Sequence, residues 1–228
     1  MSPLLILTAV EVEARALART LGLPRLSPFP FVAFGRPNIR IAPVGVGAAL
    51  CDTRWPVLCD GLPCPLVVSA GVCGGLDPRL GAADLVVPER VLGPTGEVFD
   101  ISVTSHRLRA AAGLLVTTRE VVSTPAAKAA LRAASGAVAV DMESAFIVAR
   151  AVASGCRALV VRAVSDHAGE GLPLELVDLV TETGGVRLAR ALALLSTRPA
   201  LLPRAIALGR RTRRALRAVA PALAALAA

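Results

Sequence analysis

The chain has 228 residues, 54% hydrophobic and 18% charged, which excludes a disordered protein and favours one globular domain with a substantial core. Its formal net charge is +8, but seven arginines between Arg198 and Arg217 carry most of it and leave the remainder at only +1. The chain has no Tyr and only five Phe, so it offers few aromatic surfaces on which bases could stack. We therefore do not expect it to bind nucleic acid.

The sequence gives no indication of export, disulfide bonds or metal. No segment has the length or composition of a secretory signal or a membrane span, so we expect a cytoplasmic protein. The five cysteines are an odd number without a CxxC pair, which favours reduced thiols. The two histidines, His106 and His167, have no further ligand at helical spacing, and we expect no metal site.

Short apolar runs alternate with longer helical segments along the chain. The apolar runs predict strands at residues 4–8, 39–44, 65–69, 84–87, 113–116, 137–140 and 158–164. Helices are predicted at residues 11–21, 48–58, 128–134, 144–154, 188–196 and through the arginine-rich tail. This order predicts an α/β protein, a single-domain three-layer α/β/α fold around a central mixed, largely parallel twisted sheet. We place the catalytic domain at residues 1–197 and a helical extension at residues 198–228.

The extension has the pattern of a basic amphipathic helix. One arc of its helical wheel carries apolar residues, and most of the arginines lie on the other side; the apolar residues are Leu201, Leu208, Leu216, Val219, Leu223 and Leu226. Pro221 is expected to break or kink the helix near its end. Such a helix can lie on an anionic bilayer, which would place the protein at the inner face of the membrane. Alternatively, it packs its leucines on the body and leaves its arginines in solvent.

Two glycine-rich segments follow predicted strands. Gly45-Val46-Gly47 opens a helix, but the third glycine of a dinucleotide-binding motif is replaced by Leu50, which argues against a nicotinamide site. The second segment, residues 71–75, predicts a turn near the substrate. Backbone N–H groups at Gly71, Val72 and Gly74 could face an anion or a ribose there, and a turn that needs positive φ explains the glycines equally well.

Carboxylates follow three of the predicted strands. Glu11 and Glu13 come after residues 4–8, Asp141 and Glu143 after residues 137–140, and Asp166 after residues 158–164. Ligands of open α/β sheets bind outside the carboxyl ends of the strands, so acids from separate strands can converge on one pocket. One such acid is more often a helix cap, but three strands that end in this way favour a site. Carboxyl groups in different environments can supply both the acid and the base for cleavage of a nucleoside C–N bond.

Four segments occur in an order that is typical of one family. They are residues 8–14 (TAVEVEA), 68–76 (VSAGVCGGL), 139–145 (AVDMESA) and 161–166 (VRAVSD). Together they resemble the nucleoside phosphorylase and methylthioadenosine/adenosylhomocysteine nucleosidase superfamily, over roughly residues 4–196. The resemblance implies a phosphorylase-like fold, a small-molecule nucleoside as substrate, and a homo-oligomer.

The resemblance also implies roles for individual residues. Asp166 matches the general acid that protonates purine N7, with Ser165 beside it. Glu143 matches the carboxylate that binds the ribose hydroxyls, with Met142 under the sugar, and Glu13 matches the carboxylate that activates the attacking water. Val121 and Val122 fall where the family contacts the purine, although the nucleosidases carry an aromatic residue at the first of these positions.

The chain departs from the phosphorolytic branch of the family at two positions. Ser69 replaces the usual arginine, and Val72 replaces the usual serine. Either the reaction is hydrolytic, which the presence of Glu13 favours, or phosphate is a co-substrate bound by another arginine. The arginines considered for this are Arg15, Arg36, Arg40 and Arg90. We expect no other cofactor.

The arginine-rich tail narrows the resemblance to one subgroup of the family. The extension, the segment at residues 124–131 and the Asp-Met-Glu-Ser form of the ribose motif are similar to the hopanoid-associated phosphorylase subgroup. This similarity implies removal of adenine from adenosylhopane in hopanoid synthesis. The alternatives are a methylthioadenosine/adenosylhomocysteine nucleosidase, a futalosine hydrolase, and a non-catalytic nucleoside-binding protein that docks on membranes.

Overall fold

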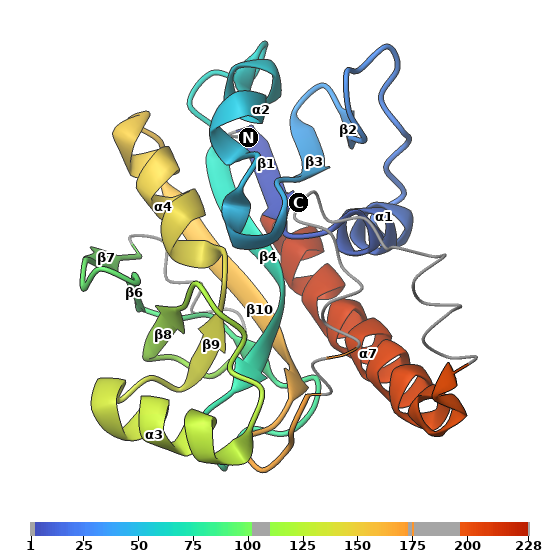
Figure 1. Cartoon of the computed structure of the whole chain (residues 1–228). Helices are drawn as coiled ribbons and strands as arrows, with labels where there is room; N and C mark the ends of the chain where they lie inside the picture. The colour runs from blue at the N-terminus through green and yellow to red at the C-terminus, as the bar shows by residue number, and fades with distance from the viewer. Residues whose placement is uncertain (1–2, 102–109, 173–174, 176–196, 228) are drawn as a thin grey trace.

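The computed structural model describes residues 3–101, 110–172, 175 and 197–227, and Figure 1 shows their arrangement. Its centre is a twisted mixed sheet, with ten strands among the described residues. The strands are β1 (Leu4–Thr8), β2 (Phe34–Arg36), β3 (Ile39–Pro43), β4 (Leu66–Gly75), β5 (Leu85–Val86), β6 (Arg90–Leu92), β7 (Val98–Asp100), β8 (Leu114–Thr117), β9 (Ala139–Asp141) and β10 (Ala158–Asp166). All seven predicted strands are present.

Strand β4 lies at the centre of the sheet and pairs with β1, β9 and β10. The hydrogen-bonded order is β2-β3-β1-β4-β9-β8-β6-β7, and β10 pairs with β4 and with β5. Strand β1 runs parallel to residues 66–69 of β4 and β10 runs parallel to residues 67–74, whereas β9 pairs antiparallel with the last two residues of β4. The carboxyl end of β1 therefore lies beside the middle of β4, and the carboxyl end of β10 lies beside Gly74, close to the end of β4.

Helices cover both faces of the sheet. They are α1 (Glu11–Thr20), α2 (Cys51–Cys59), α3 (Pro125–Ser135), α4 (Ser144–Ala153) and α7 (Leu202–Ala227), with short 3₁₀ turns η1 (Val46–Ala48) and η2 (Pro199–Leu201). Figure 1 shows α1 and α7 on one side of β4 and β10, and α2 and α4 on the other. The three-layer α/β/α prediction is confirmed.

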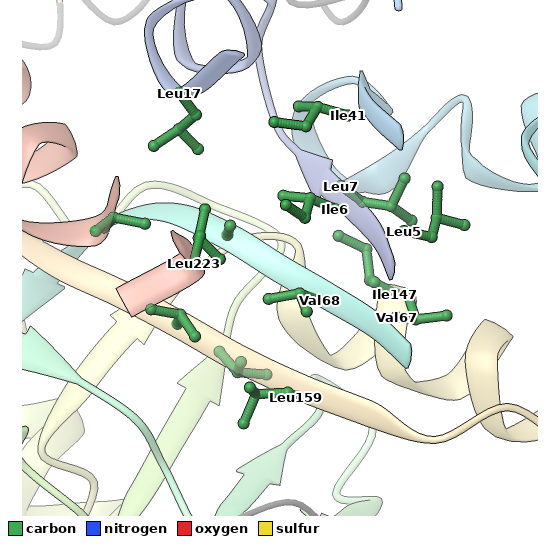
Figure 2. Close-up of a cluster of buried hydrophobic side chains, with 14 of the residues drawn as sticks. Leu5, Ile6, Leu7, Leu17, Ile41, Val67, Val68, Ile147, Leu159 and Leu223 are labelled. Carbon is green, nitrogen blue, oxygen red and sulfur yellow. The ribbon is translucent and has the colours of Figure 1, made fainter. Parts of the chain in front are cut away.

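The core lies between these layers. Figure 2 shows Leu5, Ile6 and Leu7 of β1 beside Val67 and Val68 of β4 and Leu159 of β10, all fully buried. Leu17 of α1 and Leu223 of α7 approach this cluster, as does Ile147 of α4. The strands are buried on both faces, which explains why their sequences are continuous apolar runs.

Helix α7 belongs to this core. Its predicted apolar arc faces the body: Leu216, Val219 and Leu223 are buried, and the helix packs on β10, β4 and α1. The boundary predicted at residue 197 is therefore a change of composition that does not separate two cores. The helix does not break at Pro221 but continues to Ala227, with Pro221 exposed.

Three further predictions differ from the structure. The turn predicted at residues 71–75 is wrong, because Gly71, Val72 and Gly74 lie inside β4, which continues to Gly75. The helix expected to begin at residue 48 begins at Cys51, after a 3₁₀ turn in which Gly47 adopts a φ of 61°. Strands β2, β6 and β7 were not predicted because three residues are too few to show a period. The helix predicted at residues 188–196 lies outside the described residues.

Candidate functional site

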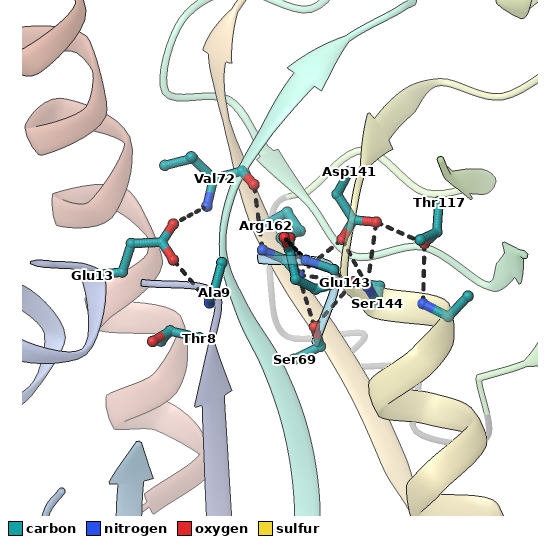
Figure 3. Close-up of polar contacts among 12 residues, drawn as sticks. Thr8, Ala9, Glu13, Ser69, Val72, Thr117, Asp141, Glu143, Ser144 and Arg162 are labelled. Carbon is teal, nitrogen blue, oxygen red and sulfur yellow. Dashed lines mark hydrogen bonds and ion pairs between the residues drawn. The ribbon is translucent and has the colours of Figure 1, made fainter. Parts of the chain in front are cut away.

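Four buried charged side chains gather beside Gly71 and Val72 of β4. Figure 3 shows Glu13 of α1 on one side of β4, and Arg162 of β10 with Asp141 and Glu143 on the other. At most 6% of each of these four residues is exposed. Glu13 lies in the first turn of α1 and Asp141 at the end of β9, whereas Arg162 lies in the middle of β10. Glu13 and Val72, 59 positions apart in the sequence, are thereby brought into contact.

Glu13 is held by backbone donors. Its Oε2 accepts hydrogen bonds from the N–H groups of Ala9 at 3.1 Å and Val10 at 3.3 Å, which closes the first turn of α1. Its Oε1 reaches across to β4 and accepts from the N–H of Val72 at 3.1 Å. Burial raises the pKa of Glu13 above its ordinary value, although the charge of Arg162 and the N–H donors oppose the rise. A fixed carboxylate with a raised pKa is suited to accept a proton from water.

Arg162 is the cation at the centre of this cluster. Its Nη2 lies 2.8 Å from Asp141 Oδ2 and 3.7 Å from Glu143 Oε2, and it donates to Ser69 Oγ at 2.9 Å. Its Nε donates to Ser144 Oγ at 3.3 Å. Burial by itself would lower the pKa of Arg162, but the surrounding carboxylates raise it. The guanidinium is therefore occupied by protein groups.

Asp141 and Glu143 have different roles although they are two residues apart. Asp141 accepts from Thr117 Oγ1 at 2.7 Å and from the N–H of Ser144, so it holds the start of α4 as well as Arg162. Glu143 accepts from the N–H of Gly47 at 3.1 Å. Burial raises the pKa of Glu143 to about 7; Arg162 opposes this rise, and the neighbouring carboxyls of Asp141 and Glu13 add to it.

Gly71 allows Glu13 and Arg162 to approach β4. It pairs with Arg162 across the parallel ladder and has a φ of +153°. A Cβ atom there would lie 2.7 Å from Glu13 Oε1 and 2.8 Å from Arg162 Nη1, closer than real contacts allow. The glycine is therefore needed because two charged groups approach the strand, and not because the chain turns.

Asp166 lies at the end of β10 in a second cluster. Its Oδ2 is 2.5 Å from Nζ of Lys128, and its Oδ1 accepts from Ser165 Oγ at 2.6 Å. Lys128 and Asp166 are 0% and 2% exposed. Asp166 Oδ2 would lie 3.3 Å from a Cβ atom on Gly74, so the second cluster is three residues further along β4 than Gly71. Three strand residues span about 10 Å, which separates the two clusters along one strand.

The remaining predicted residues lie around these clusters. Met142 is half-buried between Asp141 and Glu143. Val121 and Val122 are half-buried in the segment between β8 and α3, and Val122 packs against a small apolar cluster that includes Leu76 and Val140. The structure therefore brings Glu13, Glu143 and Asp166 to one strand, but it records no contact of Val121 with them.

The four arginines considered for phosphate lie elsewhere. Arg15 pairs with Glu11 on the exposed side of α1. Arg36 donates to the carbonyl of Gly22 at 3.0 Å, and Arg40 donates to carbonyls at the end of α2. Arg90 is exposed on β6. In the part of the chain that the structure describes, no group of three or more His, Cys, Asp or Glu could hold a metal ion.

Comparison with known proteins identifies the family. The chain is 32% identical over 204 residues to the futalosine hydrolase of Streptomyces coelicolor, a match covering 73% of this chain and 84% of that protein. The family model described as the phosphorylase superfamily matches residues 100–197. The chain belongs to the phosphorylase superfamily. It is an enzyme of the nucleosidase and phosphorylase type.

Solved structures of the phosphorylase superfamily share the fold. A methylthioadenosine/adenosylhomocysteine nucleosidase from Helicobacter pylori, in complex with butyl-thio-DADMe-Immucillin-A, superposes with a TM-score of 0.71 at 17% identity. That match covers 100% of this chain and 98% of the other. The native futalosine hydrolase of the same organism gives a TM-score of 0.69 at 16% identity, covering 97% and 95%.

Sequence reasoning missed the two cations of this phosphorylase-superfamily site. Arg162 lies in the segment at residues 161–166 and Lys128 in the segment at residues 124–131, but the family resemblance implied a role for neither. Arg162 could have been noticed as a charged residue in the middle of the apolar run at residues 158–164, where a charge needs a buried partner. Lys128 gives no such signal, because a lysine in the first turn of an alanine-rich surface helix is ordinarily exposed.

Proposed function

We propose that this enzyme cleaves the N-glycosidic bond of a purine nucleoside with an apolar 5′ substituent, the substrate class to which adenosylhopane belongs. The observation that carries the proposal is the placement of Glu13, Glu143 and Asp166 along one stretch of β4. The first two lie near Gly71 and the third near Gly74, separated by about 10 Å. This spacing matches that between the sugar and the base of a nucleoside.

Each carboxyl suits one part of the reaction. Asp166 protonates purine N7 as the C1′–N9 bond breaks and its electron pair moves to the base. Glu143 accepts hydrogen bonds from the ribose hydroxyls. Glu13, held on three backbone N–H groups with a raised pKa, removes a proton from the water that attacks C1′.

The contacts favour water over phosphate as the nucleophile. Ser69 and Val72 occupy the positions where the phosphorolytic relatives place an arginine and a serine. Ser69 is fully buried and accepts from Arg162, and the N–H of Val72 donates to Glu13. A phosphate at this place would have to displace Glu13 from the N–H of Val72.

The first test is release of adenine. The enzyme is incubated with adenine nucleosides that carry alkyl groups of increasing length at the 5′ position, with and without phosphate. We expect free adenine in both conditions and free ribosyl product, with kcat/KM rising with the length of the 5′ group. Ribosyl 1-phosphate as the product would replace water by phosphate, and no adenine in either condition would refute the proposed function.

The second test is Asp166→Asn, which keeps the shape of the side chain and removes its acid. We expect turnover of a purine nucleoside to fall about 10²–10⁴-fold while the nucleoside still binds. A matched substrate, a 4-nitrophenyl riboside, has a leaving group that needs no protonation and should be cleaved nearly as well as by the wild type. Wild-type rates on the purine nucleoside would remove Asp166 as the acid.

One alternative is favoured by a specific observation. The relative that is 32% identical is a futalosine hydrolase, whose name indicates hydrolysis of a different nucleoside. Comparing kcat/KM for futalosine, methylthioadenosine and the 5′-alkyl adenine nucleosides separates the candidates. A preference of at least tenfold for futalosine or methylthioadenosine would replace the apolar substrate. The non-catalytic alternative is excluded by any turnover.

Membrane contact is part of this proposal, because a substrate with a large hydrocarbon group resides in a bilayer. The leucine arc of α7 is occupied by the body, so the membrane would meet the opposite face. That face carries Leu202 and Ile206, 46% and 45% exposed, together with the exposed Arg213 and Arg217. Each such arginine contributes roughly 1 kcal/mol near an anionic surface. Within the described residues, no helix is long and apolar enough to span a bilayer.

Deleting the tail would remove part of the core, so the membrane test uses surface substitutions. Replacing Arg210, Arg213, Arg214 and Arg217 by Gln leaves the buried face of α7 intact. We expect weaker binding to vesicles of anionic lipid than for the wild type, and a difference that disappears at high salt. Equal partitioning of the two proteins would assign α7 to packing alone.

A further inference from the structure

Lys128 is a buried lysine in direct contact with the proposed acid. Thr124 caps α3 by accepting from the N–H of Ala127 at 3.1 Å, and this places Lys128 in the first turn, pointing toward the end of β10. Its Nζ lies 2.5 Å from Asp166 Oδ2, 2.9 Å from the carbonyl of His167 and 3.0 Å from the carbonyl of Glu170. The three hydrogens of an ammonium group thus have three close acceptors.

The oxygens of Asp166 are both acceptors in this arrangement. Oδ2 accepts from Lys128, and Oδ1 accepts from Ser165 Oγ at 2.6 Å. Ser165 Oγ also lies 3.2 Å from the carbonyl of Cys73, which can receive its hydrogen instead. A carboxylate with a donor on each oxygen is satisfied in its ionised form. A general acid, however, must carry a proton when it meets the base.

Other charged groups around the pair are matched among themselves. Glu170 pairs with Arg211 of α7, and the exposed His167 ring lies 4.0 Å from Glu170. On α3, one turn after Lys128, Arg132 pairs with Asp77. Burial raises the pKa of the Cys73 thiol, so that thiol stays neutral. Arg162 and Asp141, which also act on Cys73, pair with each other.

We propose that Lys128 keeps Asp166 ionised in the free enzyme, so that binding of a purine nucleoside takes up one proton from solution. The inference rests on the proposed function of Asp166. Purine N7 and a carboxylate are both acceptors and repel each other at hydrogen-bond distance, so a proton must lie between them. Lys128 acts through Asp166 and is therefore a positioning residue.

The proton balance of the cycle follows. On binding, a solvent proton joins Oδ1 of Asp166, and the Ser165 hydroxyl turns to the carbonyl of Cys73. When the C1′–N9 bond breaks, its electron pair moves into the purine and the O–H proton passes to N7. Asp166 returns to the ionised form beside Lys128, which keeps all three of its hydrogens throughout.

The test compares two ligands that differ at N7. Carbocyclic adenosine has an acceptor at N7 and cannot form the ribosyl cation, whereas formycin A presents an N–H at this position. Titration calorimetry in buffers of different ionisation enthalpy measures the protons taken up. For the wild type at neutral pH we expect about one proton more for carbocyclic adenosine than for formycin A. The affinity for carbocyclic adenosine should weaken about tenfold for each pH unit of rise. Both ligands present the same hydroxyls to Glu143. Any change in the protonation of Glu143 is therefore the same for both and cancels in the difference between them.

Variants at position 128 supply the contrast. In Lys128→Met we expect the buried Asp166 to carry its own proton. Binding of carbocyclic adenosine then takes up no proton from solution, and binding of formycin A releases one. Lys128→Arg should take up the same number of protons as the wild type with each ligand. Equal proton uptake for the two ligands by the wild type overturns the proposal, even if the methionine variant does not fold. If the enzyme binds neither ligand and releases no adenine, the proposed function itself is wrong.

Discussion

Two buried clusters lie along β4, and they differ in how many carboxyls share one cation. Near Gly71, Arg162 is surrounded by three carboxyls, those of Glu13, Asp141 and Glu143. Near Gly74, Lys128 has one carboxyl, that of Asp166, and the carbonyls of Asp166, His167 and Glu170. The first cluster therefore has more carboxyls than cations, whereas the second has one of each. Excess buried carboxyls raise one another's pKa, which suits a base and a site for a sugar cation, whereas a balanced pair keeps its acid ionised until a base arrives.

The largest effect on activity should come from removing the proposed base of the first cluster, Glu13. Glu13→Gln keeps the acceptor geometry toward Val72 but cannot take a proton, and we expect kcat to fall about 10²–10⁴-fold. The loss should be equal for a purine nucleoside and for a 4-nitrophenyl riboside, because the attack on the sugar fails with either leaving group. Asp166→Asn should lose activity on the purine substrate alone. If both variants lose activity only on the purine, the two clusters do not divide the chemistry as proposed.

Removal of the shared cation should be the largest effect on folding. Arg162→Met leaves three buried carboxyls without a counter-charge, and we expect the free energy of unfolding to fall by about 3–5 kcal/mol. Lys128→Met leaves a single carboxyl, which can take a proton and hydrogen-bond to Ser165. The free energy of unfolding should therefore fall less in Lys128→Met than in Arg162→Met. Urea unfolding of the two variants measures the difference, and a larger loss for Lys128→Met would contradict the comparison.

The excess of buried carboxyls in the first cluster also predicts how stability depends on pH. The pKa of Glu143 is raised to about 7 in the folded protein, so the folded state binds a proton that the unfolded state releases above about 4.5. The contribution of Glu143 to the free energy of unfolding is therefore fully present below pH 4.5. It decreases as pH rises to about 7, by roughly 3 kcal/mol. Unfolding of the wild type and of Glu143→Gln at pH 5 and pH 7 gives this contribution by difference, and equal pH dependence in the two proteins would exclude it.

The smallest effect tests why the first cluster needs a glycine. In Gly71→Ala the new Cβ would lie within 2.8 Å of both Glu13 and Arg162, and we expect a loss of about 1–3 kcal/mol in the free energy of unfolding. Gly209→Ala on α7 is the control. A Cβ there meets nothing within 4 Å, and alanine should stabilise the helix by roughly 0.5–1 kcal/mol. A neutral Gly71→Ala would mean that the charged groups can move away without cost.

The sequence by itself determined the local elements and the candidate carboxyls. Residues 4–8, 65–69 and 158–164 are apolar without alternation, and such runs form strands wherever both faces of a sheet are covered. Glu13, Glu143 and Asp166 could be selected because they follow such strands and stand in motifs of a known family. Strands of three residues and the continuation of β4 through residues 71–75 could not be predicted, because neighbouring strands impose those conformations on the chain.

Only the tertiary structure decided which cation each acid meets. Lys128 contacts Asp166 from 38 residues away, and Arg162 of β10 contacts Glu143 at the start of α4. Burial and ion pairing depend on which elements pack together, and no local pattern encodes that. The same reason settles α7: its amphipathic sequence suits a bilayer or a protein body equally well, and the sheet supplies the apolar surface that Leu216, Val219 and Leu223 cover.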